Sequence, residues 1–487
     1  MLVIVTIIIY FALLFGISKI VGRGEQSNSN HAFFKAENKS PWFIVAFGMI
    51  GATISGVTFV SVPGMPRAID MTYMQLVIGF FFGYIFVAKL LLPLYYRLGL
   101  TSIYTYLEQR IGPKAYKTGS LFFLLSRMLG TAAKLYLVCL ILQHFVFNNL
   151  DIPLWLIAAV AVALVWVYTH QSGIKTIVWT DALQTACLVL ALIAIVFSVM
   201  QQLNLSPTEA YQTIRESSHS RIFIFDDWMS KQNFFKQFIS GIFIVIVMTG
   251  LDQDMMQKNL TCRNLRDAQK NMYSYGFAFI PLNLLFLGLG ILLIMLSAKL
   301  NIELPTKSDD ILPMLATQGY LGEGVTILFT IGIIAAAFSN SDSALTSMTT
   351  SVCVDLLKTE EQETKVAIRK RNITHIGLSV LLVICISLVD IMNSPTVIDA
   401  IYVIASYTYG PLLGMFAFGL LTKRIANDNT IPYIAIASPI LCYLLGIFTS
   451  SYWSYTMGYE LLMINGLITF LGLYIGSNKS LTKTITL

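Results

Sequence analysis

The sequence predicts an all-α membrane protein with about 13 transmembrane helices. Of its 487 residues, 56% are hydrophobic and 12% are charged, a composition that excludes an ordinary soluble domain. The apolar residues occur in runs of about 20, the length that a helix needs to cross a bilayer. We therefore expect a polytopic helical bundle whose solvent is lipid.

Thirteen apolar runs qualify as spans, at approximately 2–20, 41–63, 73–97, 119–147, 152–169, 174–201, 236–253, 272–298, 324–356, 372–391, 395–421, 430–449 and 452–476. The first run has no basic start and no small-residue cleavage site, and Lys19 and Arg23 follow it. It is therefore expected to be a retained helix rather than a signal peptide. No Gly/Ser-rich linker divides the chain, which predicts a single membrane domain over residues 1–487.

Basic residues gather in the loops on one side of the predicted bundle. With the N-terminus outside, the cytoplasmic loops hold about three times as many Lys and Arg residues as the outer loops. The positive-inside rule thus predicts an outer N-terminus and a cytoplasmic C-terminus, in a plasma membrane such as the bacterial inner membrane. The net charge of +6 reflects this loop bias and forms no continuous patch, so no nucleic-acid partner is expected.

Metal-binding and catalytic patterns are missing from the sequence. The six cysteines are scattered without metal-type spacing, which predicts neither a zinc site nor a disulfide framework. The five histidines form no metal motif, and no Ser-His-Asp or paired-carboxylate pattern accompanies them. We do not expect an enzyme.

Among the few charged residues inside predicted spans, four are candidates for a functional role. Asp181 is in the sixth span and Asp342 in the ninth, while Arg127 and Lys134 are seven residues apart on the fourth, about two helical turns and so on one face. A charge at the centre of a spanning helix costs at least about 2.5–3.5 kcal/mol, which makes each one a functional candidate. For the two basic residues, a structural ion pair or snorkelling to the interface is the competing interpretation.

The ninth span contains the polar stretch IAAAFSNSDSALTSM, residues 334–348. Ala336, Ser339, Asn340 and Ser343 follow the spacing i, i+3, i+4, i+7 and share one helix face. Hard cations prefer oxygen ligands, so hydroxyl, amide and backbone oxygens here indicate a sodium site. Serines also serve tight helix packing in membranes, which is the alternative for any single one.

The second span, MIGATISGVTFVSVPGMP at residues 49–66, is rich in helix-breaking residues and hydroxyls. Its glycines, prolines and hydroxyl residues are Gly51, Gly56, Pro63, Gly64, Thr53, Ser55 and Thr58. Irregular backbone at membrane depth is tolerated where it lines a cavity. We expect a broken helix that completes the cation site and lines a solute site.

These residues carry a resemblance to the sodium:solute symporter family, whose members carry proline, galactose, sialic acid, glucose, iodide and vitamins. The matching stretches are TDALQ (180–184), LDQDMMQKNL (251–260) and AAAFSNSDSALTS followed by VDLLK. The resemblance implies a LeuT-type architecture with two inverted five-helix repeats. The repeats would cover about 41–201 and 236–421, with one extra helix before them and two after.

The resemblance also implies ligand residues. The main sodium site would use carbonyls of Gly51 and Ile54 with Ala336, Ser339 and Asn340. A second sodium site, present in some relatives, would use Asp181, Ser339, Asp342 and Ser343. The solute site would use Thr53, Ser55, Thr58, Gln75 and Arg127. Where the family has a Gln-Arg pair, this chain has Gln257 and Lys258, which we interpret as harmless anchoring at the cytoplasmic end of the seventh span.

The expected function is sodium-coupled import of a small polar organic solute by alternating access. Sugars, sialic acid or another carboxylate, amino acids and similar solutes all remain open, and one or two sodium ions would be the cofactor. A monomer is expected to suffice. The alternatives are a proton-coupled carrier through Asp342 or Asp181, an uncoupled facilitator or channel of the same fold, and a sensor.

Overall fold

The computed structural model of the protein describes residues 2–21, 33–34, 39–147, 151–169, 173–359, 362, 364–392 and 397–478. Arg23 and the C-terminal end, both used in the topology prediction, lie outside these residues. The described part is helical apart from one short antiparallel pair, β1 (Ile425–Ala426) and β2 (Ser477–Asn478), in which Ile425 is opposite Asn478. The all-α prediction is confirmed.

The first half of the chain runs from the peripheral helix α1 to the short helix α11. Its helices are α1 (Leu2–Val21), α3 (Trp42–Thr53), α4 (Gly56–Ile69), α5 (Tyr73–Phe86), η2 (Val87–Leu91), α6 (Leu92–Leu98), α7 (Thr105–Arg110), α8 (Pro113–Ile141), η3 (Leu142–Val146), α9 (Leu154–Thr169), α10 (Ile174–Leu203) and α11 (Pro207–Glu216).

The second half continues the bundle with longer helices. They are α12 (Phe234–Val245), η4 (Ile246–Gly250), α13 (Gln253–Leu260), α14 (Leu265–Lys299), η5 (Ser308–Asp310), α15 (Ile311–Thr317), α16 (Glu323–Ser351), η6 (Val352–Leu356), α17 (Thr364–Met392), α18 (Val397–Leu421), η8 (Asp428–Thr430), α19 (Ile431–Trp453) and α20 (Leu461–Ile475).

Each of the predicted spans coincides with a helix, but the count of thirteen spans is not confirmed. Within the described residues, eight helices are long and apolar enough to cross a membrane, and two bent helix pairs raise the number to ten. The helices at the predicted spans 2–20, 152–169 and 452–476 are shorter, with apolar parts of 10–17 residues. The structure therefore supports a polytopic bundle without fixing thirteen crossings.

The predicted boundary between the last two spans is wrong. The helix α19 continues to Trp453 instead of ending near 449, and α20 begins only at Leu461. Ser454 adopts the left-handed conformation (φ 50°), which ends the helix in the way that a C-terminal cap does. The loop after Ser454 therefore takes residues that hydropathy alone assigned to a span.

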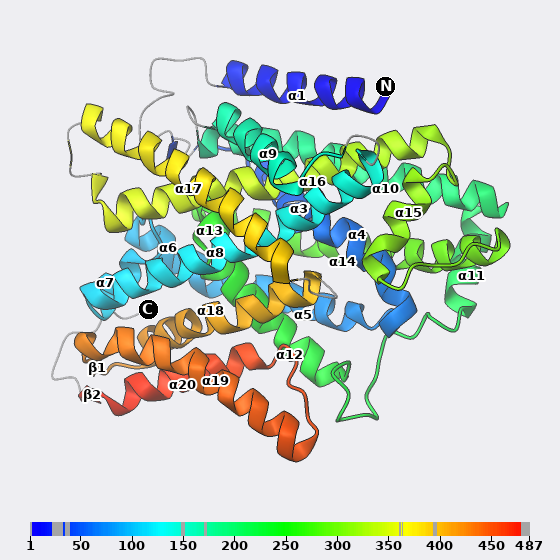
Figure 1. The fold of residues 1–487 in the computed structure, drawn as a ribbon. Coiled ribbons are helices and arrows are strands. Elements are labelled where there is room, and N and C mark those ends of the chain that lie inside the picture. Colours follow the sequence, from blue (N-terminus) through cyan, green and yellow to red (C-terminus); the bar gives the residue numbers. More distant parts are fainter. Residues whose placement is uncertain are drawn as a thin grey trace.

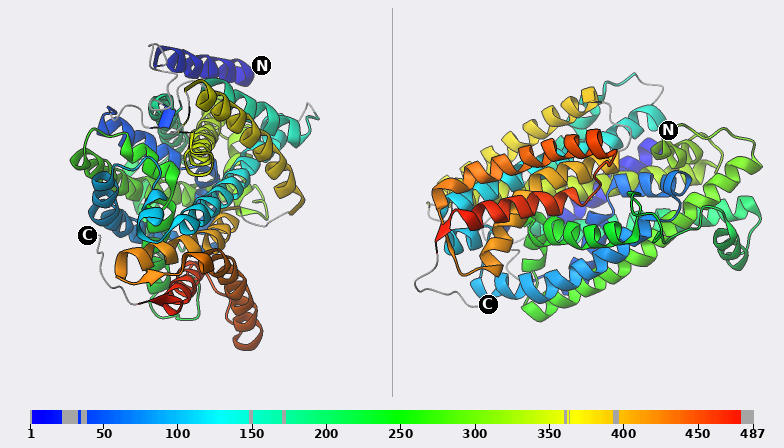
Figure 2. Two further views of the ribbon diagram at one scale, coloured as in Figure 1. Left: turned by 90° about the vertical axis from the view of Figure 1, so that its left-hand side faces the viewer. Right: turned by 90° about the horizontal axis from the view of Figure 1, so that it is seen from below.

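The long helices run side by side, with α1 at one edge of the bundle and α19 and α20 at the opposite edge (Figures 1 and 2). The centre is occupied by α16, which packs against α8, α10, α3 and α4. Every residue of α16 from Gly332 to Ser351 is buried. Its Ala and Ser side chains permit this close packing, and they bring the polar stretch 339–343 to the middle of the molecule.

Two helix pairs are sharply broken. The pair α3 and α4 bends by 60°, as the glycines and hydroxyls of the second span predict. A second break, between η4 and α13, bends by 65° and was not predicted. Because of this break, Gln253–Leu260 form a separate helix, and every residue of it is buried.

The helices α5 and α12 cross at a pair of glycines. A Cβ atom on Gly241 would lie 2.4 Å from the Leu76 carbonyl oxygen and 3.1 Å from the Gly79 Cα. Both neighbours are backbone atoms, so a side chain at this position requires the helices to move apart. By contrast, Gly446 on α19 has nothing within 4 Å of the corresponding position.

We predict that Gly241→Ala lowers the thermal unfolding temperature of the purified protein, because overpacking of a helix contact costs about 1–3 kcal/mol. The matched change Gly446→Ala should leave that temperature unchanged or raise it slightly, since Ala is favoured over Gly in helices by about 0.5–1 kcal/mol. Thermal unfolding in detergent measures both. Equal effects of the two substitutions would contradict the crossing geometry.

Candidate functional site

A cavity lies at the break between α3 and α4. The two helices are separated by Ile54 (ψ 75°) and by the extended residue Ser55 (ψ 167°). The space beside them has an empty volume of about 680 Å³, which is in the range of small-molecule sites. Its walls come from α3, α4, α5, α8, α12, η4, α13, α14, α16 and α18. Elements far apart in the sequence thus meet at one broken helix.

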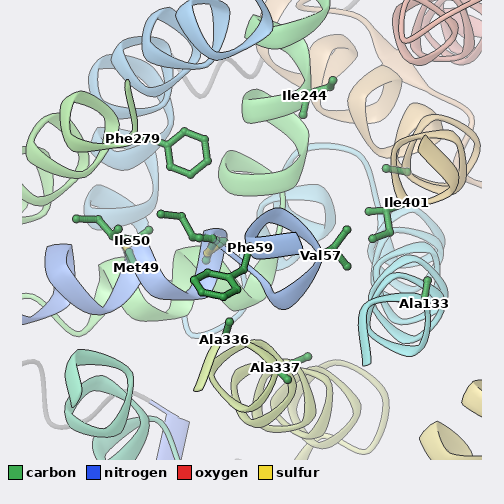
Figure 3. Close-up of a cluster of buried hydrophobic side chains, with 14 of the residues drawn as sticks. Met49, Ile50, Val57, Phe59, Ala133, Ile244, Phe279, Ala336, Ala337 and Ile401 are labelled. Atoms are coloured by element: carbon green, nitrogen blue, oxygen red, sulfur yellow. The ribbon is translucent and has the colours of Figure 1, made fainter. Parts of the chain in front are cut away.

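The walls are mostly apolar or aromatic. In Figure 3, Val57, Ile244, Phe279 and Ile401 lie around the break on four different elements. The other apolar and aromatic lining residues are Ala52, Tyr73, Phe80, Tyr84, Val245, Met248, Met255 and Tyr402. Such walls accept the hydrocarbon part of a solute and offer few partners for a chain of hydroxyl groups.

Polar groups converge at one end of the cavity. Ser55 and Thr58, at the start of α4, line it, and among the described residues their hydroxyls have no hydrogen-bond partner. No side chain caps the N-terminus of α4, so its first amides and its positive dipole end are available to an anion. Thr53 also lines the cavity, but its hydroxyl is shared with Tyr275 at 2.5 Å.

Lys134 on α8 is the free cation at this end. It lines the cavity together with Arg127, and no carboxylate in the described part of the chain lies within 4.0 Å of its ammonium group. When protonated, it can therefore pair with a bound anion. Sequence analysis singled out Lys134 as an intramembrane charge but gave the solute contact to Arg127.

Arg127 is engaged in an internal ion pair. Its guanidinium hydrogen-bonds the Asp254 carboxylate and lies 3.9 Å from Asp252, and the arginine side chain is only 7% exposed. Ser343 donates to the other oxygen of Asp254, while Tyr409 donates to Asp252. Arg127 lines the cavity as predicted, but its charge is already compensated by α13.

Asp252 and Asp254 follow directly after the second break. Asp252 accepts hydrogen bonds from the amides of Asp254 (2.9 Å) and Met255 (3.2 Å) and so caps the N-terminus of α13. This helix end is satisfied within the protein, in contrast to the uncapped end of α4. The free ends of the two broken helices therefore differ: only that of α4 is open to a ligand.

Two residues of the predicted main sodium site, Asn340 and Ser339, lie on α16 where it packs against α3 and α10. The Asn340 amide nitrogen donates to the Ala52 carbonyl oxygen at 2.9 Å, and its oxygen is buried with no partner among the described residues. Ser339, on the same face of α16, donates to Asp181 at 2.6 Å. The two helices are thus in direct contact where sodium ligands are expected.

The close approach of α3 is set by Gly51. A Cβ atom there would lie 2.0 Å from the Thr185 hydroxyl oxygen on α10. Ile54, the other predicted carbonyl ligand, leaves the helical conformation, which turns its carbonyl away from the helix ladder. Ala336 is buried on α16, one turn before Asn340. The contact between Asn340 and Ala52 places this part of α16 against the end of α3.

The predicted second sodium site contains a lysine. The Lys258 ammonium lies 2.7 Å from one Asp181 carboxylate oxygen, while Ser339 donates to the other oxygen. Lys258 is 2% exposed and Asp181 is 1% exposed. The interpretation of Lys258 as an interfacial anchor is therefore wrong, because the break before α13 carries this residue into the bundle.

The other two residues predicted only for the second sodium site, Asp342 and Ser343, also form hydrogen bonds within the protein. Asp342 accepts a hydrogen bond from the Tyr168 hydroxyl at 2.8 Å and another from the Ser343 amide. The Ser343 side chain donates to Asp254. Asp342 and Ser343 are thus close to the Asp181 group, but their oxygens serve contacts within the protein.

The structure does not bring Gln75 to the cavity. Its amide nitrogen donates to the Gln232 carbonyl oxygen at 2.8 Å, and its oxygen accepts from the Ile224 amide at 3.1 Å. Gln75 thus fixes the segment between α11 and α12 to the start of α5. Sequence reasoning missed Asp252 and Asp254. The signal that could have identified them is a pair of carboxylates at the end of the apolar seventh span, 236–253.

A model of the sodium:solute symporter family matches residues 33–431. Among similar proteins, a sodium/sialic acid symporter of Aliivibrio fischeri is 24% identical over 448 residues, which cover 88% of this chain and 86% of that protein. The human sodium/iodide cotransporter is 25% identical, and the match covers 84% of this chain and 65% of the cotransporter. Mouse sodium-coupled monocarboxylate transporter 1 is 24% identical, with coverage of 82% and 65% respectively.

Solved structures share the fold. A sodium-coupled sialic acid symporter in a substrate-bound outward-open state superposes with a TM-score of 0.82 and 19% identity, covering 98% of this chain and 97% of that chain. A transporter of the nucleobase-cation-symport-1 family gives a TM-score of 0.59 at 16% identity, covering 93% and 95%. At these identities the likeness concerns the fold alone.

We predict that Arg127→Met destabilises the protein by about 3–5 kcal/mol, because it leaves the buried Asp254 carboxylate unpaired. Adding Asp254→Asn should recover part of this loss in thermal unfolding. The control is Arg221→Met at the exposed Arg221–Asp226 pair (3.0 Å), for which a loss of at most about 1 kcal/mol is expected. A small loss for Arg127→Met would show that the pair is not a buried constraint.

Proposed function

Because the chain belongs to the sodium:solute symporter family and is a sodium-coupled solute carrier, we propose that its solute is a small organic carboxylate with an apolar body. The observation that carries this proposal is the Lys134 side chain, which lines a mostly apolar cavity together with the Ser55 and Thr58 hydroxyls. Sialic acid and other carboxylates agree in charge with such a site. Neutral sugars and polyols would leave the charge of the lysine uncompensated.

The anion would lie between Lys134 and the N-terminus of α4. The carboxylate would face the ammonium, the Ser55 and Thr58 hydroxyls and the first amides of α4. Hydrogen bonds to a charged group are about twice as strong as those between neutral groups. The low polarity of the remaining wall favours a monocarboxylate with an alkyl or aromatic body over a polyhydroxylated acid.

Sodium would bind at the α3 side of the same break. We assign it the carbonyl oxygens of Gly51, Ile54 and Ala336 with the side-chain oxygens of Ser339 and Asn340. The support is the unpartnered, buried Asn340 oxygen beside the end of α3. Neutral oxygens of this kind suit a hard monovalent cation, whereas a proton needs no such group of oxygens.

Coupling follows from the shared broken helix. Sodium at the end of α3 would hold this helix against α16, and the solute at the start of α4 would use the same rigid arrangement. Each ligand then raises the affinity for the other, since linkage is reciprocal. When the bundle opens to the cytoplasm, α3 and α16 separate and both ligands lose their site.

The two bent pairs support the inverted-repeat organisation. One begins the predicted repeat 41–201 and the other begins the predicted repeat 236–421, with bends of 60° and 65°. We therefore propose that α3–α10 and α12–α18 are the two repeats of a single transporter domain. The basic loops favour a plasma-membrane location, such as the bacterial inner membrane, with the N-terminus outside.

Sodium, unlike potassium, should raise the thermal stability of the purified protein and support solute uptake into proteoliposomes. Asn340→Ala should raise the sodium concentration for half-maximal stabilisation roughly tenfold, which corresponds to about 1.4 kcal/mol. The control is Asn283→Ala, which truncates a buried asparagine that donates to the Phe279 carbonyl oxygen at 2.8 Å and does not line the cavity. Equal stabilisation by potassium would support a proton-coupled or uncoupled carrier instead.

In a panel of short carboxylates, sialic acid, amino acids and neutral sugars, carboxylates should stabilise the protein in sodium. A ligand at a hundredfold excess over its Kd contributes about 2.7 kcal/mol. Lys134→Gln should weaken carboxylate binding by about 10- to 150-fold, the equivalent of 1.5–3 kcal/mol for a charged hydrogen bond. Lys134→Arg should retain more of the affinity.

The control for that substitution is Lys117→Gln, a change of an exposed lysine on the same helix. It should leave binding unchanged. Stabilisation by neutral sugars and not by carboxylates, or full affinity in Lys134→Gln, would contradict the carboxylate proposal while leaving sodium coupling intact.

A further inference from the structure

We propose that the Lys258 ammonium takes the place of a second sodium ion, so that this carrier couples one sodium ion to each solute molecule. The inference rests on the proposed function, because it concerns the cation stoichiometry of the same symporter. Its starting observation is the ion pair between Lys258 and Asp181, with 2.7 Å between nitrogen and oxygen.

Both oxygens of Asp181 are in use. One faces the Lys258 ammonium, and the other accepts the Ser339 hydroxyl at 2.6 Å. A sodium ion bound to Asp181 would have to displace the ammonium or share one carboxylate with it. Two cations on one buried carboxylate repel each other strongly where water does not screen them. The Lys258 ammonium thus supplies the positive charge that a second sodium ion would bring, and it keeps that ion from binding to Asp181.

The position of Lys258 is built by α13. Because the helix starts after the second break, Asp254 and Lys258 are four residues apart and share one face. The helix packs against both α10, which carries Asp181, and α16, which carries Ser339. The lysine is 2% exposed, so its charge has no route to water in this arrangement and is a fixed part of the bundle.

Of the carboxylates around the pair, Asp342 is held by hydrogen bonds and has no basic partner within 4.0 Å among the described residues. The groups facing the pair are Asp342 on α16, which accepts from Tyr168, and Asp254 on α13, which is paired with Arg127. Asp254 and Asp181 each have one basic partner. The Asn340 amide that is proposed for the main sodium site contacts the end of α3. Ser339 lies between the main sodium site and the lysine, because its hydroxyl donates to the Asp181 carboxylate that Lys258 also faces.

A tethered ammonium changes the energetics of transport. A bound ion leaves the protein in every cycle, whereas Lys258 stays and contributes no ion gradient. One sodium ion and one monovalent carboxylate carry no net charge together. Uptake of such a solute is then driven by the sodium concentration gradient and is insensitive to membrane potential.

Equilibrium binding of sodium-22 to the purified protein tests the inference without a known solute. We expect about one sodium ion per chain and a Hill coefficient near 1. Lys258→Met keeps the unbranched stem without its terminal ammonium and so removes the charge. In this variant a second ion should enter, giving about two ions per chain and a Hill coefficient near 2. The double variant Lys258→Met/Asp181→Asn should return to one ion.

The exposed lysine substitution Lys270→Met is the control and should bind one ion. Two sodium ions per chain in the unchanged protein would overturn the inference, and that result does not depend on whether Lys258→Met folds. One ion in both the unchanged protein and a folded Lys258→Met would also overturn it. Absence of any sodium binding would instead contradict the proposed main site, so the two failures are distinguishable.

Discussion

Every free backbone group and every charge in the interior of a membrane-embedded bundle must find its partner within the protein, and this constraint governs the structure. Lipid offers no hydrogen bonds, so a broken helix is stable only where neighbours satisfy its exposed ends. Asn340 donates to the Ala52 carbonyl oxygen at the end of α3, and Asp252 caps α13. The uncapped start of α4, the Lys134 ammonium and the Asn340 amide oxygen are exceptions, and all three belong to residues at the same cavity.

The same constraint distributes the charges over many helices. Arg127 on α8 pairs with Asp254 on α13, and Lys258 on α13 pairs with Asp181 on α10. The α13 helix is only eight residues long, yet it holds both pairs. Opening the bundle therefore cannot separate α13 from these helices without leaving buried charges unpaired. Rearrangements that keep α13 with α8 and α10 avoid that cost.

Most of the fold could be predicted from the sequence because lipid selects apolar runs, and each run coincides with a helix. The break in the second span was also predictable, since its glycines and hydroxyls are local signals. The break before α13 was not predictable, because the sequence LDQDMMQKNL is polar and is locally typical of a loop. Only contacts with distant helices show that this stretch is buried.

The candidate site was predictable in its residue types but not in its pairings. Arg127 and Lys134 share one face of α8 and looked equivalent in the sequence. The residue that neutralises Arg127 lies 127 positions away in the chain, and no spacing rule links the two. Gln75 was assigned to the cavity from its place at the start of the third span, but the backbone of the 224–232 segment uses both ends of its amide.

The identity of the basic residues also bears on their separate roles. Arginine presents a planar fork that can hold two carboxylates, and Arg127 faces both Asp254 and Asp252. Lysine carries a compact point charge on a flexible stem. Such a charge can replace a monovalent ion, as we infer for Lys258, or meet a mobile carboxylate, as proposed for Lys134. The two lysines differ in what surrounds them. Lys258 is paired with Asp181 inside the protein, whereas Lys134 lines the cavity, where the carboxylate of the solute would be its partner.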